Sequence, residues 1–249
     1  MKYNFPPCVY AETLLELPKL SELDIRVAKQ YLPMIVEYYS QRLLLDEKAH
    51  DYLYVKYGIS PLVSRHYSLG YSDRTLGAEF SHTNFAEREI LRGSLKRLRL
   101  FRGSGHEAFV GCVVVPILVG ESITGFYAER IARVCRNAKP FYRVRFEENC
   151  LFVTLNFEGQ RDAYFCDSPL AAIQLCGLIN KPAFATDRSF ELNDQECEYM
   201  RKLGVQDIII LKPANTLASD MSKVRKKLTL AGFRSRIEPN FLEVKYGKA

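Results

Sequence analysis

The sequence predicts an α/β protein in which a mixed part of helices and antiparallel strands precedes a parallel sheet flanked by helices. Between residues 163 and 215, short apolar runs alternate with helical patterns, the order expected for a parallel sheet with helical crossovers. A Val-rich run and an aromatic run flank Gly120, as in a β-hairpin. Helical apolar spacing between Ser21 and Tyr57 predicts the helices that come before them.

The parallel sheet begins with a predicted strand from Ala163 to Cys166. Asp167 or Ser168 can cap the next helix, because a short side-chain oxygen can accept a hydrogen bond from an N–H group of the first turn. Pro169 suits that turn, where its missing N–H group costs nothing. We expect Gly177 to end this helix.

The second and third strands are predicted at 182–186 and 207–211. Between them, Asn193 and Glu196 have the spacing of a capping box, and we expect Gly204 to end the helix that they begin. The third strand is a continuous Ile-Ile-Ile-Leu run, which is typical of a strand covered on both faces. A helix with Met221 on its apolar face and a strand at 233–237 complete the sheet.

In open parallel sheets, ligands bind beyond the carboxyl ends of the strands. Two segments occupy that edge here, Cys166–Leu170 after the first strand and Lys212–Asn215 after the third. These segments are therefore the first place to look for a catalytic or binding site.

Both segments resemble motifs of the Toprim domain, the metal-binding catalytic domain of bacterial-type (DnaG-like) DNA primases, topoisomerases and some nucleases. The run FCDSPLAAIQL resembles its Glu-Ser-Pro-x-Asp-Ala-Leu motif, and IIILKPA lies where Toprim domains carry a strand ending in Asp-x-Asp. The resemblance places the motif Glu on Asp167 and the motif Asp on Ala171. It places the two Asp of Asp-x-Asp on Lys212 and Ala214, so only one of the four acidic positions keeps a carboxylate.

The lost carboxylates bear directly on catalysis. Mg²⁺ at a phosphoryl-transfer site needs hard oxygen ligands, and a lysine at such a position repels the metal. We therefore expect no catalytic residue, no metal and no other cofactor, with Asp167 as the one candidate ligand in this register. The alternative is a Mg²⁺ site with relocated ligands, drawn from Asp187, Glu191, Asp194 and Asp207.

The N-terminal half resembles the opening of the same primases' catalytic core, and Glu147–Glu158 resembles the short connection before the Toprim strand in mobile-element primases. In AHDYLYVKYGISPLVSRHYSLGYSD, Lys56-Tyr57-Gly58 stands near the family's Arg-Gly, and Leu69-Gly70-Tyr71 matches its Leu-Gly-Tyr. Gly58 and Gly70 can also be explained as helix-end and turn residues.

The predicted hairpin resembles the family's run from Phe-Pro-Ile to Gly-Phe-x-Gly-Arg. Val115-Pro116-Ile117 and Gly125-Phe126-Tyr127-Ala128 keep its skeleton. The family's arginines, which form a basic ridge for template DNA, are partly absent: Cys112 stands near one, and Glu129 takes the place of another.

These patterns divide the chain into four predicted units. Residues 1–46 form a helical extension with one helix from Ser21 to about Tyr31, before Pro33, and a second through Val36, Tyr39 and Leu43. Residues 47–160 form an α+β subdomain similar to the N-terminal part of the primase core, residues 161–241 a degenerate Toprim-like α/β subdomain, and residues 242–249 a tail.

Two basic stretches are candidates for nucleic-acid binding. Arg88–Arg102 holds six basic residues against one acid, which suits an amphipathic helix or edge strand along a phosphate backbone, although a solvated charged face explains it as well. Residues 132–145 combine cations with Phe141 and Tyr142, which could stack on an unpaired base, although a surface loop with anchoring aromatics explains them at least as well. The candidate contacts, with Lys212 in place of the metal, are Arg92, Lys96, Arg97, Arg99, Arg130, Arg133, Lys139, Tyr142, Arg143 and Lys212.

Composition narrows the class of protein. A net charge of +6 is compatible with an anionic partner without requiring one. The seven cysteines include no C-x-x-C pair, and several lie in apolar runs, as buried reduced thiols do. Because no apolar stretch approaches about 18 residues and no signal peptide is visible, we expect a cytoplasmic protein without membrane contact.

The leading hypothesis is a non-catalytic, primase-like protein that binds DNA in the replication or maintenance of a mobile genetic element. Its partners would be single-stranded or primed DNA and replication proteins of the same element. One alternative is a protein-interaction scaffold built on the degenerate domain. The other is an active metal-dependent primase or nuclease with relocated acidic ligands.

Overall fold

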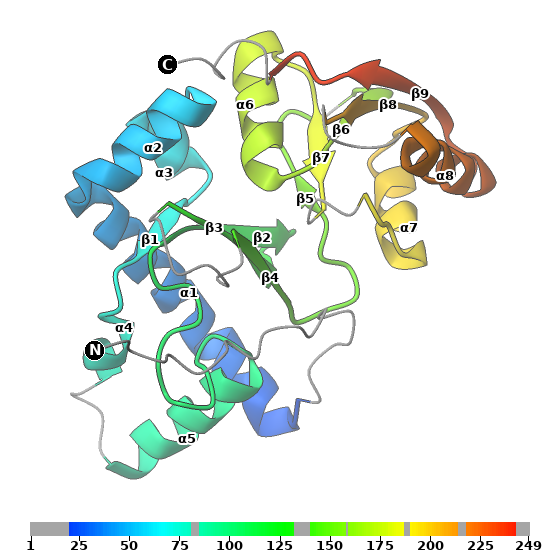
Figure 1. Ribbon diagram of the computed structural model, residues 1–249. Helices are drawn as coiled ribbons and strands as arrows, with labels where there is room; N and C mark the ends of the chain where they lie inside the picture. The colour runs from blue at the N-terminus through cyan, green and yellow to red at the C-terminus, as the bar shows by residue number, and fades with distance from the viewer. Residues whose placement is uncertain are drawn as a thin grey trace, which may run out of the picture.

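The structure is a computed structural model that describes residues 20–80, 85–131, 140–157, 159–186, 190–213 and 218–242 (Figure 1). Its strands form one sheet of four strands and one of five, and helices pack on both. The predicted α/β class, with an α+β part before a largely parallel sheet, is confirmed.

The N-terminal helix α1 (Glu22–Leu45) is continuous, so the expected break before Pro33 is wrong. Ser21 and Asp24 form a capping box at its start, and Pro33 lies inside the helix. A proline inside a helix costs about 3 kcal/mol. Leu32 and Ile35, on either side of the proline along the chain, are both buried in the same core, and this packing holds the helix together across the proline.

The next two helices have boundary residues that the local sequence explains. Helix α2 (Glu47–Tyr57) ends at Gly58, which has a φ of 64° in the left-handed region. Helix α3 (Pro61–His66) begins with Pro61 in its first turn and Ser60 as its cap, because the Ser60 hydroxyl accepts a hydrogen bond from the backbone N–H of Val63.

Gly70 has a different role from the turn residue that its position suggested. It begins β1 (Gly70–Ser72), which packs directly on α1. A Cβ atom at Gly70 would lie 2.4 Å from the Cβ atom of Tyr39. A glycine is needed here because the two backbones approach too closely for any side chain.

The first sheet is antiparallel with the strand order β1-β2-β3-β4. The predicted hairpin is formed by β2 (Cys112–Val119) and β3 (Ser122–Arg130) with Gly120 in the turn, and β4 (Phe141–Arg145) pairs with β3. Helices α1, α4 (Leu76–Glu79) and α5 (Phe85–Arg97) share a core with one face of this sheet, which includes Val114, Phe126 and Val144.

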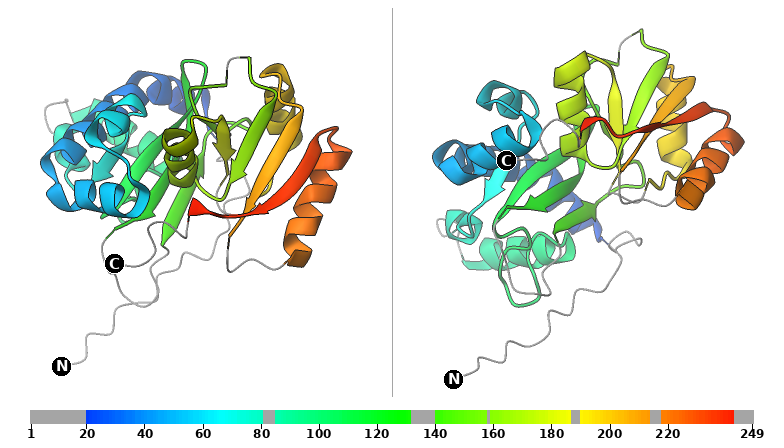
Figure 2. Two further views of the ribbon diagram at one scale, coloured as in Figure 1. Left: turned by 90° about the horizontal axis from the view of Figure 1, so that it is seen from above. Right: turned by 45° about the horizontal axis from the view of Figure 1, so that its top comes forward.

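The second sheet has the strand order β5-β7-β6-β8-β9. Strands β6 (Asp162–Cys166), β7 (Ala183–Ala185), β8 (Asp207–Lys212) and β9 (Arg234–Pro239) are parallel, and β5 (Phe152–Val153) is antiparallel to β7. Helix α6 (Pro169–Ile179) covers one face, while α7 (Asp194–Lys202) and α8 (Ala218–Leu230) cover the other (Figure 2).

The helix boundaries of this sheet follow the predicted signals with one exception. Ser168 caps α6, and Asn193 and Glu196 form the capping box of α7. Helix α6 runs past Gly177 and ends at Asn180, which takes the left-handed conformation. A glycine inside a helix costs only about 1 kcal/mol, and asparagine can end a helix in the same way as glycine.

The two sheets share one hydrophobic core. It contains Leu53 of α2, Val115 and Tyr127 of the first sheet, and Leu170 and Leu175 of α6. Helix α6 therefore contacts both halves of the molecule (Figure 1). The limits of the four predicted units remain predictions.

The described cysteines are free thiols, and all of them except Cys176 are buried. In the described ranges, no helix is long and apolar enough to cross a membrane.

Candidate nucleic-acid interface

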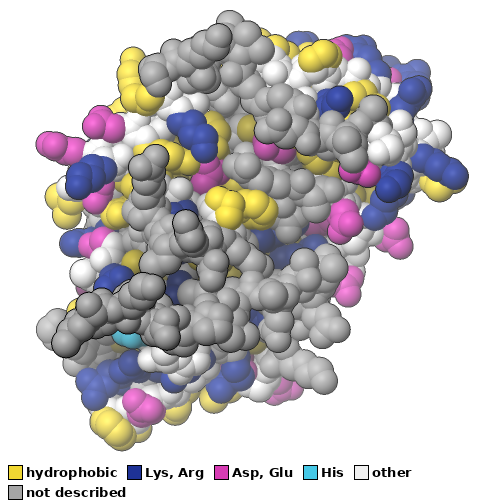
Figure 3. All heavy atoms as spheres, viewed as in Figure 1, with side chains coloured by type: hydrophobic (Ala, Val, Ile, Leu, Met, Phe, Trp, Pro, Cys, Tyr) yellow, Lys and Arg dark blue, Asp and Glu magenta, His cyan; other side chains and the backbone are white. Residues whose placement is uncertain are grey.

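The basic stretch 88–102 forms α5 and the turn that follows it. Leu91, Leu95 and Leu98 bury one side of this segment. At about 100° per residue, Arg92 and Arg97 lie about 140° apart around the helix, on opposite flanks of the buried side. Figure 3 shows Lys and Arg side chains along the lower edge of the molecule, where α5 lies.

Arg97 is held by a buried carboxylate. Its Nε atom donates hydrogen bonds of 2.8 and 2.7 Å to the two carboxylate oxygens of Asp24, and its Nη2 atom lies 2.6 Å from Oδ1. The hydrogen bond with Arg97 holds the pKa of Asp24 well below its usual range. Arg97 therefore fastens α5 to α1, and this internal role competes with its predicted contact to DNA.

Arg92, on the opposite flank, belongs to a cluster of three arginines around residues 102–111, which we call the arginine loop. Arg102 donates from Nη2 to the carbonyl oxygen of Ala108 at 3.2 Å, and Arg130 of β3 donates from Nη1 to that of Val110 at 2.9 Å. A Cβ atom at Gly105 would lie 3.3 Å from Nη2 of Arg92. Arg102 at the start of the loop, Arg92 of α5 and Arg130 of β3 thus each place a guanidinium group against this loop.

The buried thiol of Cys112 lies close to two of these cations. Burial raises its pKa to about 12, although the positive charges of Arg130 and Arg102 act in the opposite direction. A buried thiol with so high a pKa is not a nucleophile. The cysteine is therefore a packing residue beneath a positively charged surface.

Tyr142 joins the arginine loop through Arg130. The Nη2 atom of Arg130 donates to the Tyr142 hydroxyl at 2.8 Å, and the guanidinium carbon lies 5.5 Å from the ring centroid. The ring of Phe109 also packs near Tyr142, with the two ring centroids 6.4 Å apart. The structure therefore brings together Arg92, Arg130 and Tyr142 of the predicted residues, whereas Arg133 and Lys139 lie outside the described residues.

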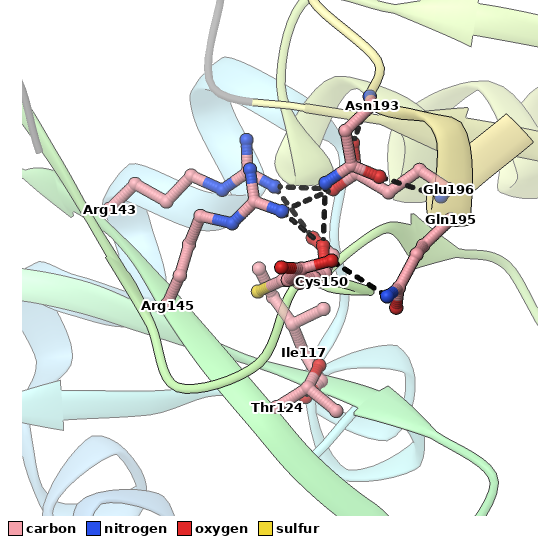
Figure 4. A network of polar contacts seen from close by, with 9 residues as sticks. Ile117, Thr124, Arg143, Arg145, Cys150, Asn193, Gln195 and Glu196 are labelled. Carbon is pink, nitrogen blue, oxygen red and sulfur yellow. Dashed lines mark hydrogen bonds and ion pairs between the residues drawn. The ribbon is translucent and has the colours of Figure 1, made fainter. Parts of the chain in front are cut away.

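The side chain of Arg143, one of the predicted DNA contacts, is buried and paired inside the protein. Its side chain is 8% exposed, and its Nη2 atom donates to the carbonyl of Cys150 at 2.7 Å and to Glu196 at 3.2 Å (Figure 4). Arg145 also pairs with Glu196 at 3.2 Å. Residues two apart on a strand share a face, so both arginines point from β4 towards the buried carboxylate on α7.

A second buried carboxylate, Glu129, lies where the resemblance placed an arginine. Lys56, Tyr52 and Tyr57 donate to its Oε1 atom at 2.6, 2.5 and 2.7 Å, and Tyr127 donates to Oε2 at 2.8 Å. Burial alone would raise the pKa of Glu129, but the charge of Lys56 and these hydrogen bonds lower it to about 2. The sequence indicated the exchange of charge at this position but not the partners Tyr52, Lys56 and Tyr57, which come from α2.

Lys212 and Asp167 meet at the carboxyl edge of the parallel sheet. Phe165 of β6 pairs with Ile210 of β8, so Asp167, directly after β6, and Lys212, the last residue of β8, both lie at this edge. Arg99 lies in the turn after α5, and Lys96 is exposed on that helix.

Of the proposed relocated ligands, Asp207 does not lie at this edge. Asp207 begins β8 at the opposite end of the sheet, where Arg234 donates to it at 2.7 and 2.5 Å. Asp194 begins α7, and Asp187 lies outside the described residues. Within the described ranges, no three His, Cys, Asp or Glu side chains are close enough to hold a metal ion.

The chain after β9 crosses the same edge. Asn240 donates its N–H to the carbonyl of Lys212 at 3.0 Å, and Leu242 is buried in the core with Leu170 and Leu211. The edge that binds ligands in open sheets is therefore partly covered by the protein's own backbone here.

No protein-family model and no curated protein matches the sequence. Three solved structures share its fold. The primase of Aquifex aeolicus, with its zinc-binding and RNA polymerase domains, superposes with a TM-score of 0.70 at 19% identity over 91% of this chain. The DnaG catalytic core gives 0.67 at 14% identity over 85%, and the DnaG primase catalytic domain bound to ssDNA gives 0.65 at 15% over 87%.

These similarities show that the chain has the fold of a DnaG-like primase core. It spans 58% of the Aquifex aeolicus chain and 72% and 71% of the other two.

Proposed function

We propose that this protein binds single-stranded DNA through the arginine loop and acts in replication as a primase-like protein without primase chemistry. The observation that carries the proposal is the convergence of Arg92, Arg102 and Arg130 on residues 102–111. Cations held together in this way displace counterions from a phosphate backbone, and Tyr142 beside them offers an aromatic surface to a base. One structure with this fold is a primase domain bound to ssDNA, which supports the choice of ligand.

The loop carbonyls give this surface a fixed geometry. Arg102 and Arg130 are each anchored to a backbone oxygen, so their guanidinium groups are oriented before a ligand arrives. An anchored side chain loses less conformational entropy on meeting a phosphate than a freely rotating one. Because guanidinium groups that contact phosphates carry no sequence information, binding should depend little on nucleotide sequence.

The carboxyl edge of the parallel sheet, as a degenerate Toprim site, would bind phosphate rather than transfer it. Lys212 is a cation beside Asp167, and among the described residues no ion pair holds its ammonium group. It could contact a phosphate where the family binds a metal, without the metal's Lewis-acid chemistry. We infer a cytoplasmic pseudoenzyme that serves the replication or maintenance of a mobile genetic element.

A second candidate function is a protein-interaction scaffold, with replication proteins of the same element as partners. Large apolar side chains exposed around α2 and α3 favour it: Leu45, Tyr54, Val55 and Leu62 are 75%, 65%, 59% and 76% exposed. This candidate predicts a stable complex with little affinity for DNA.

The test is fluorescence anisotropy of labelled single- and double-stranded DNA between about 50 and 200 mM salt, with and without Mg²⁺. We expect binding that Mg²⁺ does not change, and a log–log salt slope that falls by about 0.7 for each single-strand phosphate contact removed in Arg102→Gln. The matched control is Lys226→Gln, an exposed cation on α8, which should leave the slope unchanged. No binding at the lowest salt would overturn the proposal in favour of the scaffold.

Catalysis is tested separately. Primer-synthesis and nuclease assays with Mg²⁺ or Mn²⁺ should give no product. A metal-dependent product that disappears in Asp167→Ala would instead establish an active enzyme.

A further inference from the structure

We propose that Phe85, at the start of α5, stacks on a base of the same single strand that the arginine loop binds. This inference rests on the proposed function and adds the path of the strand and a reason for single-strand selectivity. Phe85 is 71% exposed, so its ring is accessible to a ligand. The guanidinium carbon of Arg88 lies 5.6 Å from its ring centroid, so a cation covers part of the ring.

Phe85 and the arginine loop are connected by one flank of α5. Phe85, Arg88, Arg92 and Lys96 follow one another at spacings of three or four residues, which aligns them along a helix. This stripe lies beside the buried leucines and away from the flank that Arg97 fastens to α1. The guanidinium group of Arg92 lies against Gly105, so this row of side chains adjoins the arginine loop.

The dimensions of the stripe suit a short single strand. Phe85 and Arg92 are seven residues apart, or about 11 Å along the helix. The axial repeat of about 3.4 Å per nucleotide in duplex DNA is a lower limit for an unstacked single strand, so a strand that touches both residues spans at most about three nucleotides. A strand that continues to Arg102 and Arg130 must be longer than that.

Charge and ring chemistry indicate a base, rather than a phosphate, at the Phe85 end. Glu89 is exposed one turn from Phe85 and would repel a phosphate there. A base carries no charge and can stack on the aromatic ring of Phe85. Arg88, which already lies against that ring, can add a cation–π interaction with the base. Bases in a duplex are stacked on one another and cannot reach the ring, so this contact is available only to a single strand.

The chain contains no tryptophan, so Phe85→Trp introduces a single fluorescent reporter at the proposed stacking position. We expect oligothymidylate of twelve nucleotides, roughly four times the span above, to quench its fluorescence, and an oligomer of about three nucleotides to leave it unchanged. The control is Leu62→Trp on α3, where a 76% exposed side chain lies far from α5 and should not be quenched (Figure 1).

Affinity provides the second measurement. Phe85→Ala should bind the longer oligomer about 5- to 150-fold more weakly, and Phe85→Tyr should bind it as the wild type does. Duplex binding should be the same in all three proteins.

The outcomes separate this inference from the proposed function. Absence of quenching in Phe85→Trp, with Arg102→Gln still weakening binding, overturns the stacking contact and leaves the arginine loop as the binding surface. Equal quenching in Leu62→Trp, or an equal loss of duplex affinity in Phe85→Ala, also overturns it. If the wild-type protein binds no DNA, both proposals fail together.

Discussion

Glu196 should be one of the residues on which the stability of the molecule depends most. It is fully buried, receives Arg143 and Arg145 from the first sheet, and accepts the backbone N–H of Asn193 at 3.1 Å at the start of α7. The substitution Glu196→Gln keeps the shape of the side chain and an oxygen for the capping box, but removes the charge. Two arginines that are 8% and 17% exposed then lose their counter-ion.

The expected loss of stability in Glu196→Gln depends on the interactions that the two arginines keep. Hydrogen bonds to a charged group contribute about 1.5–3 kcal/mol, and breaking a buried pair costs about 3–5 kcal/mol because an uncompensated charge stays behind. Since both arginines also keep hydrogen bonds to backbone carbonyls, we expect a loss of about 2–4 kcal/mol in the free energy of unfolding. At roughly 2–4 °C per kcal/mol for a protein of this size, Tm should fall by roughly 4–16 °C.

Urea unfolding followed by circular dichroism measures this loss, with Glu198→Gln as the matched control. Glu198 is on the same helix and pairs with Lys202, but both side chains are more than half exposed. Its substitution should leave the midpoint unchanged, because exposed pairs contribute little. If Glu196→Gln is no less stable than Glu198→Gln, the link between the two sheets does not depend on this ion pair.

Three further predictions concern packing, pH and binding. Gly70→Ala should lower the free energy of unfolding by about 1–3 kcal/mol, because its Cβ atom would lie 2.4 Å from that of Tyr39. Gly177→Ala, with nothing within 4 Å, should raise it by up to about 1 kcal/mol, and thermal unfolding of both variants compares them; equal Tm values would refute the close approach. Glu129 has a pKa of about 2 in place of 4.5, which corresponds to about 3 kcal/mol of stability that is present above pH 4.5 and is lost as the pH falls towards 2. In Glu129→Gln, the urea concentration at the unfolding midpoint should therefore fall less between pH 4.5 and pH 2 than in the wild type. An equal fall in the two proteins would contradict the lowered pKa of Glu129. Lys212→Ala should weaken binding of single-stranded DNA without changing the circular dichroism spectrum; unchanged affinity would mean that the carboxyl edge of the sheet binds no phosphate.

Local signals in the sequence predicted most of the secondary structure. Ser168, Asn193 and Gly58 act through hydrogen bonds or backbone angles within a few residues, so their roles could be inferred without knowledge of the fold. The two errors, at Pro33 and Gly177, have the opposite origin. Each residue only disfavours a helix by a few kcal/mol at most, and the rest of the helix outweighs it.

The candidate site could be predicted only in part. The sequence identified the basic stretches and the loss of carboxylates at the edge of the parallel sheet, because both are properties of composition and motif. It did not single out Arg102, which donates to a loop carbonyl. Nor did it indicate that Tyr52 and Tyr57 of α2 donate hydrogen bonds to Glu129.

The sequence by itself determined how many cations the chain carries and where along it they lie. Only the tertiary structure decided which of them can meet a ligand. Arg92 and Arg97 are five residues apart, yet one reaches the arginine loop and the other is bound by Asp24, which is 73 residues away in the chain. Arg143 is likewise bound by Glu196 from the other sheet. The reason is physical: a buried carboxylate must be paired to be stable, and only packing places it beside a particular arginine.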